Sequence, residues 1–388
     1  MRLAAWAAAF QPSAADLALA RRSLIDTVAV AVAGRSEPVA RIAAAEDEAT
    51  HWATAAHALD YDDLHLESTA HISVVCVTAA LAAGGGERAY LAGAGVMARL
   101  GAALGWAHYS RGWHATCAAG APAAAVAAGV AYGLDEAGLA RAMALAVPAA
   151  GGVQAAFGTM AKPLQVGFAV SAGVRAARLA AAGAGADPAA LDDWLRLVGG
   201  DPAALATAGP AVPGGLAIKL YPCCYALQRP VAALAGLGLD PAIVEAIAVR
   251  TPEASLQPLN RHSPRTGLEG KFSLEYGAAA ALLDHPVRFA SFTDESVVRP
   301  EAQRLAELVT VEATPGGSGL LDGSFIAEVR TATDTRSVEL ELPPGAPGRP
   351  PSEAELAAKV ADCCGALAAQ VVALGWQEGG EFLRRTLA

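Results

Sequence analysis

Residues 112–134, GWHATCAAGAPAAAVAAGVAYGL, contain no lysine, arginine, aspartate or glutamate and consist mainly of alanine and glycine. Residues 142–161 form a second uncharged stretch. Each is long enough to span a bilayer, but both contain a proline and few of the large side chains that favour insertion. Small side chains also let helices pack closely. The two stretches therefore predict buried helices of a large helical core and no membrane partner.

The overall composition excludes several classes of protein. Of 388 residues, 54% are hydrophobic and 17% are charged, so the chain buries enough apolar surface for an ordered core. The net charge of −10 argues against a nucleic-acid partner, which requires a basic face. The six cysteines include two adjacent pairs, a poor disulfide geometry, which favours free thiols in a reducing compartment. No targeting segment is expected, and the predicted location is cytoplasmic.

The sequence pattern changes at the loop of residues 209–215. Before it, apolar residues recur at helical spacing, and after it β-branched residues alternate with polar ones. We expect a mainly α chain with an α+β insert: a helical domain at 1–213, a smaller α+β lid domain at 214–348, and C-terminal helices at 349–388 that return to the helical domain. Predicted helices cover residues 15–34 (with Gly34 as C-cap), 68–84, 115–133, 135–148, 164–183 and 272–283, and predicted strands cover 243–251, 287–292, 308–313, 324–331 and 337–342.

Residues 57–71, HALDYDDLHLESTAH, place three histidines and four carboxylates within a short stretch of a weakly charged chain. An aspartate that orients an imidazole would make this an acid–base site. A metal site is the second interpretation, although the EF-hand spacing fails, because His65 and His71 stand where glycine and glutamate are required. A solvated acidic loop is the third. The residues alone leave all three open.

Only four of the 28 cationic residues are lysines, at positions 162, 219, 271 and 359. In a chain that uses arginine for most positive charges, a lysine indicates a position that needs a compact ammonium with a movable pKa rather than a planar guanidinium. Lys162 follows an apolar stretch, Lys219 precedes adjacent cysteines, and Lys271 ends a cationic loop that leads into a helix. Cationic side chains and helix N-termini attract carboxylates. These segments predict a polycarboxylate pocket between the two domains.

Six short motifs cover nearly the whole chain: LIDT at 24–27, HALDYDD at 57–63, GWHAT at 112–116, GTMAKPL at 158–164, KLYPCC at 219–224 and TGLEGKFSLEY at 266–276. In this order they resemble the motifs of the MmgE/PrpD family, which includes 2-methylcitrate dehydratases, cis-aconitate decarboxylases and iminodisuccinate epimerases. The resemblance implies a helical domain with an α+β lid, a homodimer, and no metal or organic cofactor. It also implies active-site roles for Asp60, His71, Lys162 and Tyr276.

Two departures from the decarboxylase-type pattern refine the predicted reaction: Leu64 replaces a threonine and Cys224 replaces a histidine. We expect a lyase or epimerase that moves a proton at the carbon next to a carboxylate of a small di- or tricarboxylate. Cysteine acid–base pairs suit racemisation, so Cys224 favours epimerisation over water loss. The predicted catalytic residues are Asp60, His71, Lys162, Tyr276 and Cys224, the predicted substrate-binding residues are His114, Thr159, Lys219, Arg261 and Lys271, and no metal ligand is expected.

Two alternatives from other functional classes stay open at this point. The first is a metal-dependent hydrolase that uses the cluster from His57 to His71. The second is a non-catalytic carboxylate-binding protein, which the changes at Leu64 and Cys224 suggest. Metal analysis and a test of substrate turnover separate these alternatives from the expected lyase or epimerase.

Overall fold

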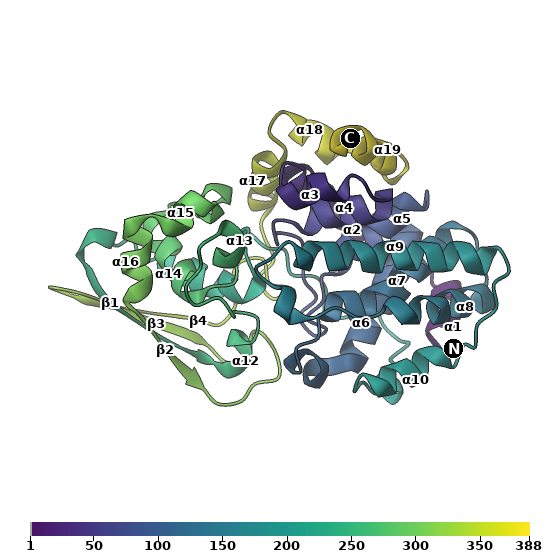
Figure 1. The fold of residues 1–388 in the computed structure, drawn as a ribbon, viewed down its shortest axis with the longest axis horizontal. Helices are drawn as coiled ribbons and strands as arrows, with labels where there is room; N and C mark the ends of the chain where they lie inside the picture. The colour runs from purple at the N-terminus through teal and green to yellow at the C-terminus, as the bar shows by residue number, and fades with distance from the viewer. Residues whose placement is uncertain (1) are drawn as a thin grey trace. The chain divides into compact units, whose positions relative to one another are not determined.

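The computed structural model describes residues 2–388, which divide into two compact units. The first unit consists of the residues up to Ala155, Ala161–Leu216 and Glu353–Ala388, and the second consists of Ala156–Met160 and Ala217–Ser352. The described part of the first unit is built from helices, as Figure 1 shows. They are α1 (Arg2–Ala9), α2 (Ala14–Gly34), α3 (Pro38–Ala43), α4 (Glu48–His57), α5 (Ile72–Ala82), α6 (Glu87–Ser110), α7 (Ala115–Ala131), α8 (Glu136–Ala146), α9 (Ala161–Ala181), α10 (Ala190–Leu197), α17 (Glu353–Cys364), α18 (Ala368–Ala373) and α19 (Trp376–Leu387).

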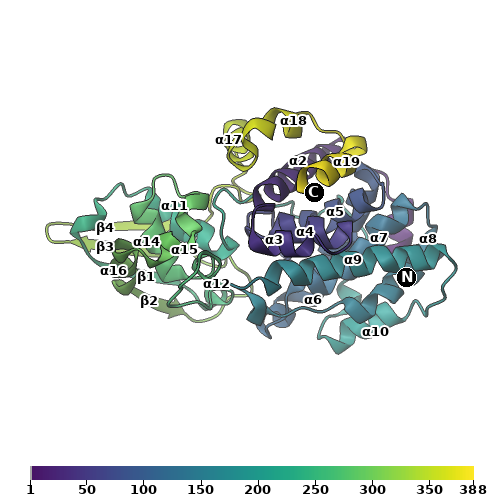
Figure 2. The same ribbon diagram turned by 45° about the horizontal axis from the view of Figure 1, so that its top comes forward.

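Helix α7 forms the core of the first unit, and every residue from Ala115 to Gly129 is buried. It packs against α5, α6, α8 and α9, and α9 also runs beside α4 (Figures 1 and 2). Small side chains allow the close approach, because a Cβ added at Gly173 of α9 would lie 2.5 Å from the carbonyl oxygen of Ala121. The uncharged stretch at 112–134 thus contains the buried core helix that its composition predicts.

The second uncharged stretch, residues 142–161, is not one helix. Helix α8 ends at Ala146, and a 3-10 turn at Val147–Ala149 follows, because Pro148 has no N–H to continue the α-helical hydrogen bonds. The prediction of a buried helix there is wrong. By length and composition, one helical stretch of the described chain, Glu353–Ala373, would be able to cross a membrane; it is interrupted by a 3-10 turn at Gly365–Leu367.

Gly34 has a different role from the one predicted. It is the last residue of α2 rather than a left-handed cap beyond it, and the C-cap is Arg35 in a right-handed helical conformation. A Cβ at Gly34 would overlap the carbonyl oxygen of Ala55 in α4. Glycine is therefore required because the two helices approach closely here, not because of the backbone conformation.

The second unit is a four-stranded mixed sheet with helices packed on it. Its strands are ordered β2-β1-β3-β4, with β1 parallel to β2 and antiparallel to β3, and β3 and β4 form a hairpin. The predicted hairpin is thus confirmed. The strands are β1 (Val244–Pro252), β2 (Val309–Thr314), β3 (Phe325–Thr331) and β4 (Thr335–Leu340), and the helices are α11 (Gln228–Ala235), α12 (Glu253–Leu256), α13 (Gly267–Gly270), α14 (Leu274–Leu283), α15 (Asp294–Val298) and α16 (Pro300–Glu307).

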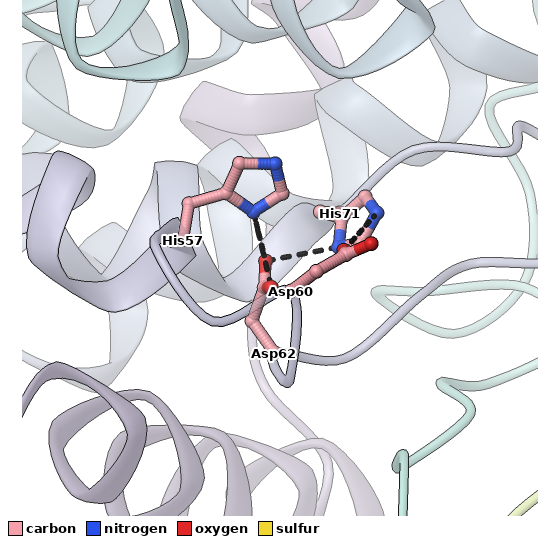
Figure 3. Close-up of side chains that lie close together, drawn as sticks. All are labelled: His57, Asp60, Asp62 and His71. Atoms are coloured by element: carbon pink, nitrogen blue, oxygen red, sulfur yellow. Dashed lines mark hydrogen bonds and ion pairs between the residues drawn. The ribbon is translucent and has the colours of Figure 1, made fainter. Parts of the chain in front are cut away.

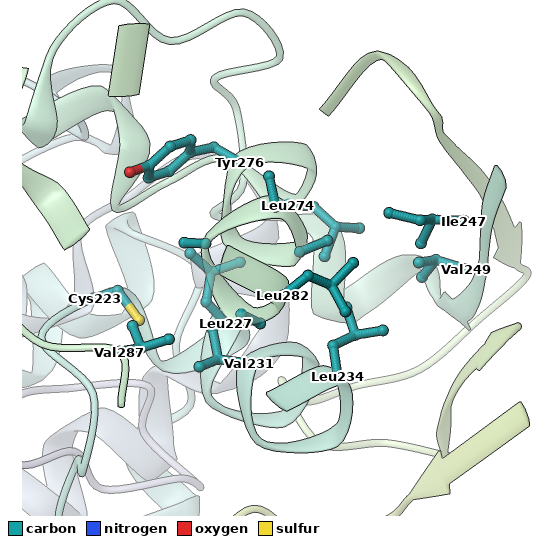
Figure 4. Packing of buried hydrophobic residues seen from close by; sticks show 14 of the residues in the cluster. Cys223, Leu227, Val231, Leu234, Ile247, Val249, Leu274, Tyr276, Leu282 and Val287 are labelled. Carbon is teal, nitrogen blue, oxygen red and sulfur yellow. The ribbon is translucent and has the colours of Figure 1, made fainter. Parts of the chain in front are cut away.

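The core of this unit lies between the sheet and helices α11 and α14 (Figure 4). Ile247 and Val249 point from β1 toward Leu234 and Leu282 of these helices. Burial alternates along β3, as expected for a strand with one covered face. The prediction of a strand at 287–292 is wrong, because residues Phe289–Phe292 form a 3-10 turn.

Candidate active site

The segment between α4 and α5 carries a buried group of ionisable side chains. His57 is the last residue of α4, and His71 is the N-cap of α5. The chain turns at Asp60, whose N–H donates to the carbonyl of His57 and whose φ is +52°. A positive φ is uncommon and strained in a non-glycine residue, so the surrounding structure must hold it. At the other end, the N–H of His71 donates to Oγ1 of Thr116 in α7 at 3.1 Å, which fixes the segment to the helical core.

Asp62 holds two imidazoles at once (Figure 3). Its Oδ2 atom accepts from Nδ1 of His57 and from Nδ1 of His71, each at 2.9 Å. Burial alone would raise the pKa of Asp62, but the two imidazoles outweigh burial and hold this pKa well below its usual range. An ionised carboxylate only accepts hydrogen bonds, so both histidines donate from Nδ1 and have a lone pair at Nε2 when neutral. Asp62 therefore orients both imidazoles so that Nε2 of each is the nitrogen that can accept a proton.

Lys162, in the first turn of α9, supplies a positive charge to this group. Its Nζ lies 2.6 Å from Nε2 of His57 and 3.2 Å from Oδ1 of Asp60. Lys162 is 4% exposed, so its charge is stabilised by pairing rather than by water. Burial, assisted by the charge of Lys162, lowers the pKa of His57 although Asp62 opposes it. His57 is therefore neutral at neutral pH and accepts a hydrogen bond from the ammonium.

His71 is the more exposed of the two imidazoles that Asp62 holds. Its side chain is 9% exposed, against 0% for His57 and 1% for Asp62. Its Nε2 lies 3.7 Å from Oδ1 of Asp60, so a proton taken up at Nε2 would face a carboxylate. The predicted catalytic residues Asp60, His71 and Lys162 are thus placed together by the first unit.

His114, predicted to bind substrate, lies beside the same group. It is the N-cap of α7, and its ring centroid is 6.0 Å from that of His57 with the two planes 25° apart. Burial and the charge of Lys162 hold the pKa of His114 well below its usual range. His114 is consequently a neutral imidazole at neutral pH.

The fourth lysine anchors the main chain of this segment. Lys359 of α17 is buried, with its Nζ 2.7 Å from Oδ1 of Asp26 in α2 and 2.9 Å from the carbonyl oxygen of Tyr61. The ammonium also lies 4.1 Å from the centroid of the Tyr61 ring, within reach of a cation–π interaction. Because Tyr61 stands between Asp60 and Asp62, Lys359 holds the backbone that carries both carboxylates.

The remaining predicted site residues lie in the second unit. Nζ of Lys271 donates to the carbonyl of Pro222 at 2.5 Å and lies 4.9 Å from the centroid of the Phe292 ring. The hydroxyl of Tyr276 donates to the carbonyl of Ser291, and burial raises its pKa. Lys271 and Tyr276 therefore both make contacts within their own unit. The predicted residues in this unit are Thr159, Lys219, Cys224, Arg261, Lys271 and Tyr276.

Arg261 and Thr159 also have partners inside the second unit. The guanidinium of Arg261 donates twice to the carbonyl of Phe157, at 3.1 and 2.7 Å. Oγ1 of Thr159 donates to the carbonyl of Ala156 at 2.7 Å. Both side chains therefore stabilise the short segment at 156–160, and their contact with a substrate stays a prediction.

The group in the first unit also meets the distance requirement of a metal site. Ligand atoms of His57, Asp60, Asp62 and His71 all lie within 4.8 Å of one another. Asp62, however, already accepts from both imidazoles, and the ammonium of Lys162 contacts His57 and Asp60. A divalent cation at this position would be repelled by that ammonium. The donor set therefore fits proton transfer better than metal binding.

Asp62 is not among the site residues that the sequence predicts, although it lies in the predicted cluster at 57–71. Four carboxylates within residues 57–71 signal a site, but the turn at Asp60 decides which of them meets both imidazoles. The interpretation as a solvated acidic loop is wrong, because Asp62 and Asp63 are each 1% exposed. Gln165, which contacts His114 at 2.6 Å, was also missed, since an isolated glutamine gives no sequence signal.

Comparisons with known proteins cover both units. Residues 43–195 match the MmgE/PrpD N-terminal domain, and residues 221–374 match the MmgE/PrpD C-terminal domain. A cis-aconitate decarboxylase of Aspergillus terreus is 27% identical over 349 residues, which cover 79% of this chain and 70% of that protein. The cis-aconitate decarboxylases of Homo sapiens and Mus musculus are 28% and 30% identical over 224 and 225 residues, which cover 52% of this chain and 45% of each relative.

Proposed function

The chain belongs to the MmgE/PrpD family, and from this premise we propose that it is a cofactor-independent enzyme that moves a proton at the carbon next to a carboxylate of a small di- or tricarboxylate. The observation that carries the proposal is the pair of imidazoles that Asp62 orients, with Lys162 2.6 Å from one of them. The cis-aconitate decarboxylases among its relatives are named for a substrate of this class.

Such a carbon-bound proton is weakly acidic, so its removal needs a positioned base and stabilisation of the charge that develops. In the proposed reaction, Nε2 of His71 takes the proton, and the electron pair of the C–H bond moves into the adjacent carboxylate to form an enolate-like dianion. Asp62 stabilises the imidazolium through Nδ1. The ammonium of Lys162 provides the positive charge that stabilises the enolate.

Two outcomes are consistent with this first step. In an epimerisation, a proton returns to the same carbon from the opposite face, and the electron pair moves back into the new C–H bond. In a dehydration, the electron pair instead forms a C=C bond to the neighbouring carbon. The hydroxyl on that carbon gains a proton and leaves as water. Cys224 favours epimerisation and is the proposed acid.

The second unit is proposed to bind the substrate carboxylates. Lys219 and Lys271 are the lysines of its motifs, and Arg261 lies in the cationic loop that precedes the TGLEGKFSLEY motif. Thr159 precedes Lys162 in the GTMAKPL motif. Tyr276 is proposed to donate or orient from this unit. Its raised pKa keeps the phenol protonated at neutral pH, so it would not act as a base. To donate to a substrate, its O–H would have to leave the carbonyl of Ser291.

Proton exchange in D₂O tests the proposal directly. The protein is incubated with citrate, 2-methylcitrate, cis-aconitate or iminodisuccinate, and NMR follows deuterium incorporation and product formation. We expect one of them to exchange or react, and His71→Gln and Lys162→Met to slow it by about 10²-fold or more. His51→Gln, on α4 outside the group, is the matched control and should leave the rate unchanged. If a carboxylate binds but neither exchanges nor reacts, the protein is a carboxylate-binding relative and the proposal fails.

A metal-dependent hydrolase is the second candidate, because His57, Asp60, Asp62 and His71 meet the distance requirement of a metal site. Metal analysis of the purified protein, with activity measured before and after chelation, separates the two functions. Activity that persists after chelation supports proton transfer without a metal. Stoichiometric zinc or iron whose removal abolishes activity would replace the proposal with the hydrolase.

A further inference from the structure

Two hydrogen-bond donors face one nitrogen of His114. Nε2 of Gln165 lies 2.6 Å from Nδ1 of His114, and Sγ of Cys117 lies 3.2 Å from the same atom. An amide NH₂ group donates and does not accept, and a thiol is a weak donor. Nδ1 of His114 is therefore the acceptor, provided that the amide of Gln165 has the orientation just described.

The main chain of Val153 determines this orientation. The N–H of Val153 donates to Oε1 of Gln165 at 3.2 Å, and Nε2 of Gln165 donates to the carbonyl of Val153 at 3.3 Å. If the amide were rotated by 180°, its oxygen would face the carbonyl and its NH₂ would face the N–H, so both hydrogen bonds would be lost. The backbone thus directs the NH₂ group of Gln165 toward His114.

Val153 is itself held against the segment that carries His114. Trp113 and Val153 form an isolated antiparallel bridge, the N–H of His114 donates to the carbonyl of Gly152 at 3.0 Å, and Gly152 has a φ of +95°. A Cβ at Gly152 would lie 2.7 Å from Cβ of Cys117 and 3.3 Å from Oε1 of Gln165. The arrangement of Gln165 and His114 therefore rests on a hydrogen-bonded backbone that leaves no room for a side chain at Gly152.

We propose that Gln165 is a positioning residue that keeps the proton of His114 on Nε2, so that His114 acts as a neutral hydrogen-bond donor to a substrate carboxylate or to the enolate oxygen. The catalytic part of this inference rests on the proposed function. His57 and His71 have the opposite tautomer, because their Nδ1 atoms donate to Asp62. The site then combines imidazoles that accept at Nε2 with one that donates at Nε2.

The electrostatic surroundings agree with a neutral His114. Burial has the largest effect on the pKa of His114 and lowers it. Among the charged groups, Lys162, His57 and His71 oppose its protonation and Asp60 favours it. A neutral imidazole has a single N–H, so its tautomer decides whether it offers a proton or a lone pair at Nε2. Hydrogen-bond donors aimed at a developing oxyanion are among the largest contributions to catalysis.

Gln165→Glu is the variant that separates positioning from packing. Glutamate has almost the same shape, but its carboxylate accepts where the amide donates, so Nδ1 of His114 would have to carry a proton. Nitrogen NMR of protein labelled with ¹⁵N-histidine, with the signals of His114 assigned from a His114→Gln sample, reports the tautomer without any substrate. We expect Nε2–H in the unmodified protein and a proton at Nδ1 in Gln165→Glu. A proton at Nδ1 in the unmodified protein would overturn the inference.

Activity with the carboxylate that reacts provides the second measurement. We expect kcat to fall by about 10²-fold in Gln165→Glu, as when one oxyanion donor is lost, and by less in Gln165→Met, which removes the donor without adding a charge. Gln370→Glu, at an exposed position of α18, is the matched charge control and should retain full activity. If the tautomer changes and kcat does not, the catalytic role of His114 is refuted. If no carboxylate reacts with the unmodified protein, the proposed function fails, and NMR still decides the tautomer.

Discussion

Replacement of Lys359 by methionine removes one partner of a buried ion pair and keeps the length of the side chain. The ammonium lies 2.7 Å from Oδ1 of Asp26, 2.9 Å from the carbonyl of Tyr61 and 4.1 Å from the Tyr61 ring centroid. Methionine fills a similar volume but offers none of these interactions. Asp26 would then be a buried carboxylate that has lost its ion-pair partner, and its Oδ2 has no hydrogen-bond partner to compensate.

The expected loss of stability follows from this geometry. Removal of one partner from a buried ion pair typically lowers the free energy of unfolding by about 3–5 kcal/mol, and we expect a loss in this range for Lys359→Met at pH 7.5. Burial raises the pKa of Asp26, whereas Lys359 opposes the increase, so the variant raises this pKa further. A carboxyl whose pKa is raised by folding stabilises the protein less as pH rises from its unfolded value of 3.8 toward the folded value. The deficit should therefore shrink at acidic pH, where Asp26 is protonated.

Urea unfolding followed by circular dichroism measures these free energies. The series contains Lys359→Met, Asp26→Asn, the double variant, and Arg41→Met as an exposed charge control that should change stability by less than about 0.5 kcal/mol. The double variant should recover most of the loss, because replacing both partners leaves no unpaired charge. A loss below about 1 kcal/mol for Lys359→Met, or a double variant as unstable as the single one, would refute the reasoning. If Lys359→Met does not fold, recovery of a folded double variant decides the question.

Three further outcomes are expected. Asp62→Asn should lower kcat by about 10²–10⁴-fold while the protein stays folded, because a neutral amide replaces the carboxylate that accepts from both imidazoles. Steady-state kinetics with circular dichroism checks this, and unchanged kcat contradicts it. Burial raises the pKa of Asp63 to about 7, so its contribution to the free energy of unfolding falls as pH rises from 3.8 to about 7. In Asp63→Asn this pH dependence should disappear. If urea unfolding gives the same pH dependence for the variant, the raised pKa of Asp63 is contradicted. Gly34→Ala should lower the free energy of unfolding by about 1–3 kcal/mol, because the added Cβ overlaps the carbonyl of Ala55. Gly120→Ala adds a Cβ that makes only ordinary contacts and should raise the free energy of unfolding by up to about 1 kcal/mol. Equal effects of the two changes in thermal unfolding would contradict the packing argument.

Local sequence signals predicted many of the elements correctly. The helix at Ala115–Ala131 and the strands at Val244–Pro252 and Phe325–Thr331 arise where hydrophobic spacing and turn residues agree. The strand predicted at 287–292 failed because side-chain contacts override a short β-branched pattern: Ser291 caps a 3-10 turn there and its carbonyl accepts from Tyr276.

For the site, local sequence patterns indicated the segments in which ionisable side chains are grouped. Charge is scarce in this chain, so the clustered histidines and carboxylates of 57–71 and the isolated lysines were informative, and the order of the motifs indicated the family. These are properties of residues that are close in sequence, or of motifs that retain their order along the chain.

Which of these residues contact one another depends on the packing of the helices. Lys162 contacts His57, 105 positions away in the sequence, and Lys359 contacts the carbonyl of Tyr61, 298 positions away. The sequence does not distinguish these two lysines, but the first lies in the candidate active site and the second holds the backbone of that site. Hydrogen bonds depend on distances of about 3 Å and on the direction of each donor. These quantities are set by how α9 and α17 pack on the rest of the first unit, and no local pattern contains them.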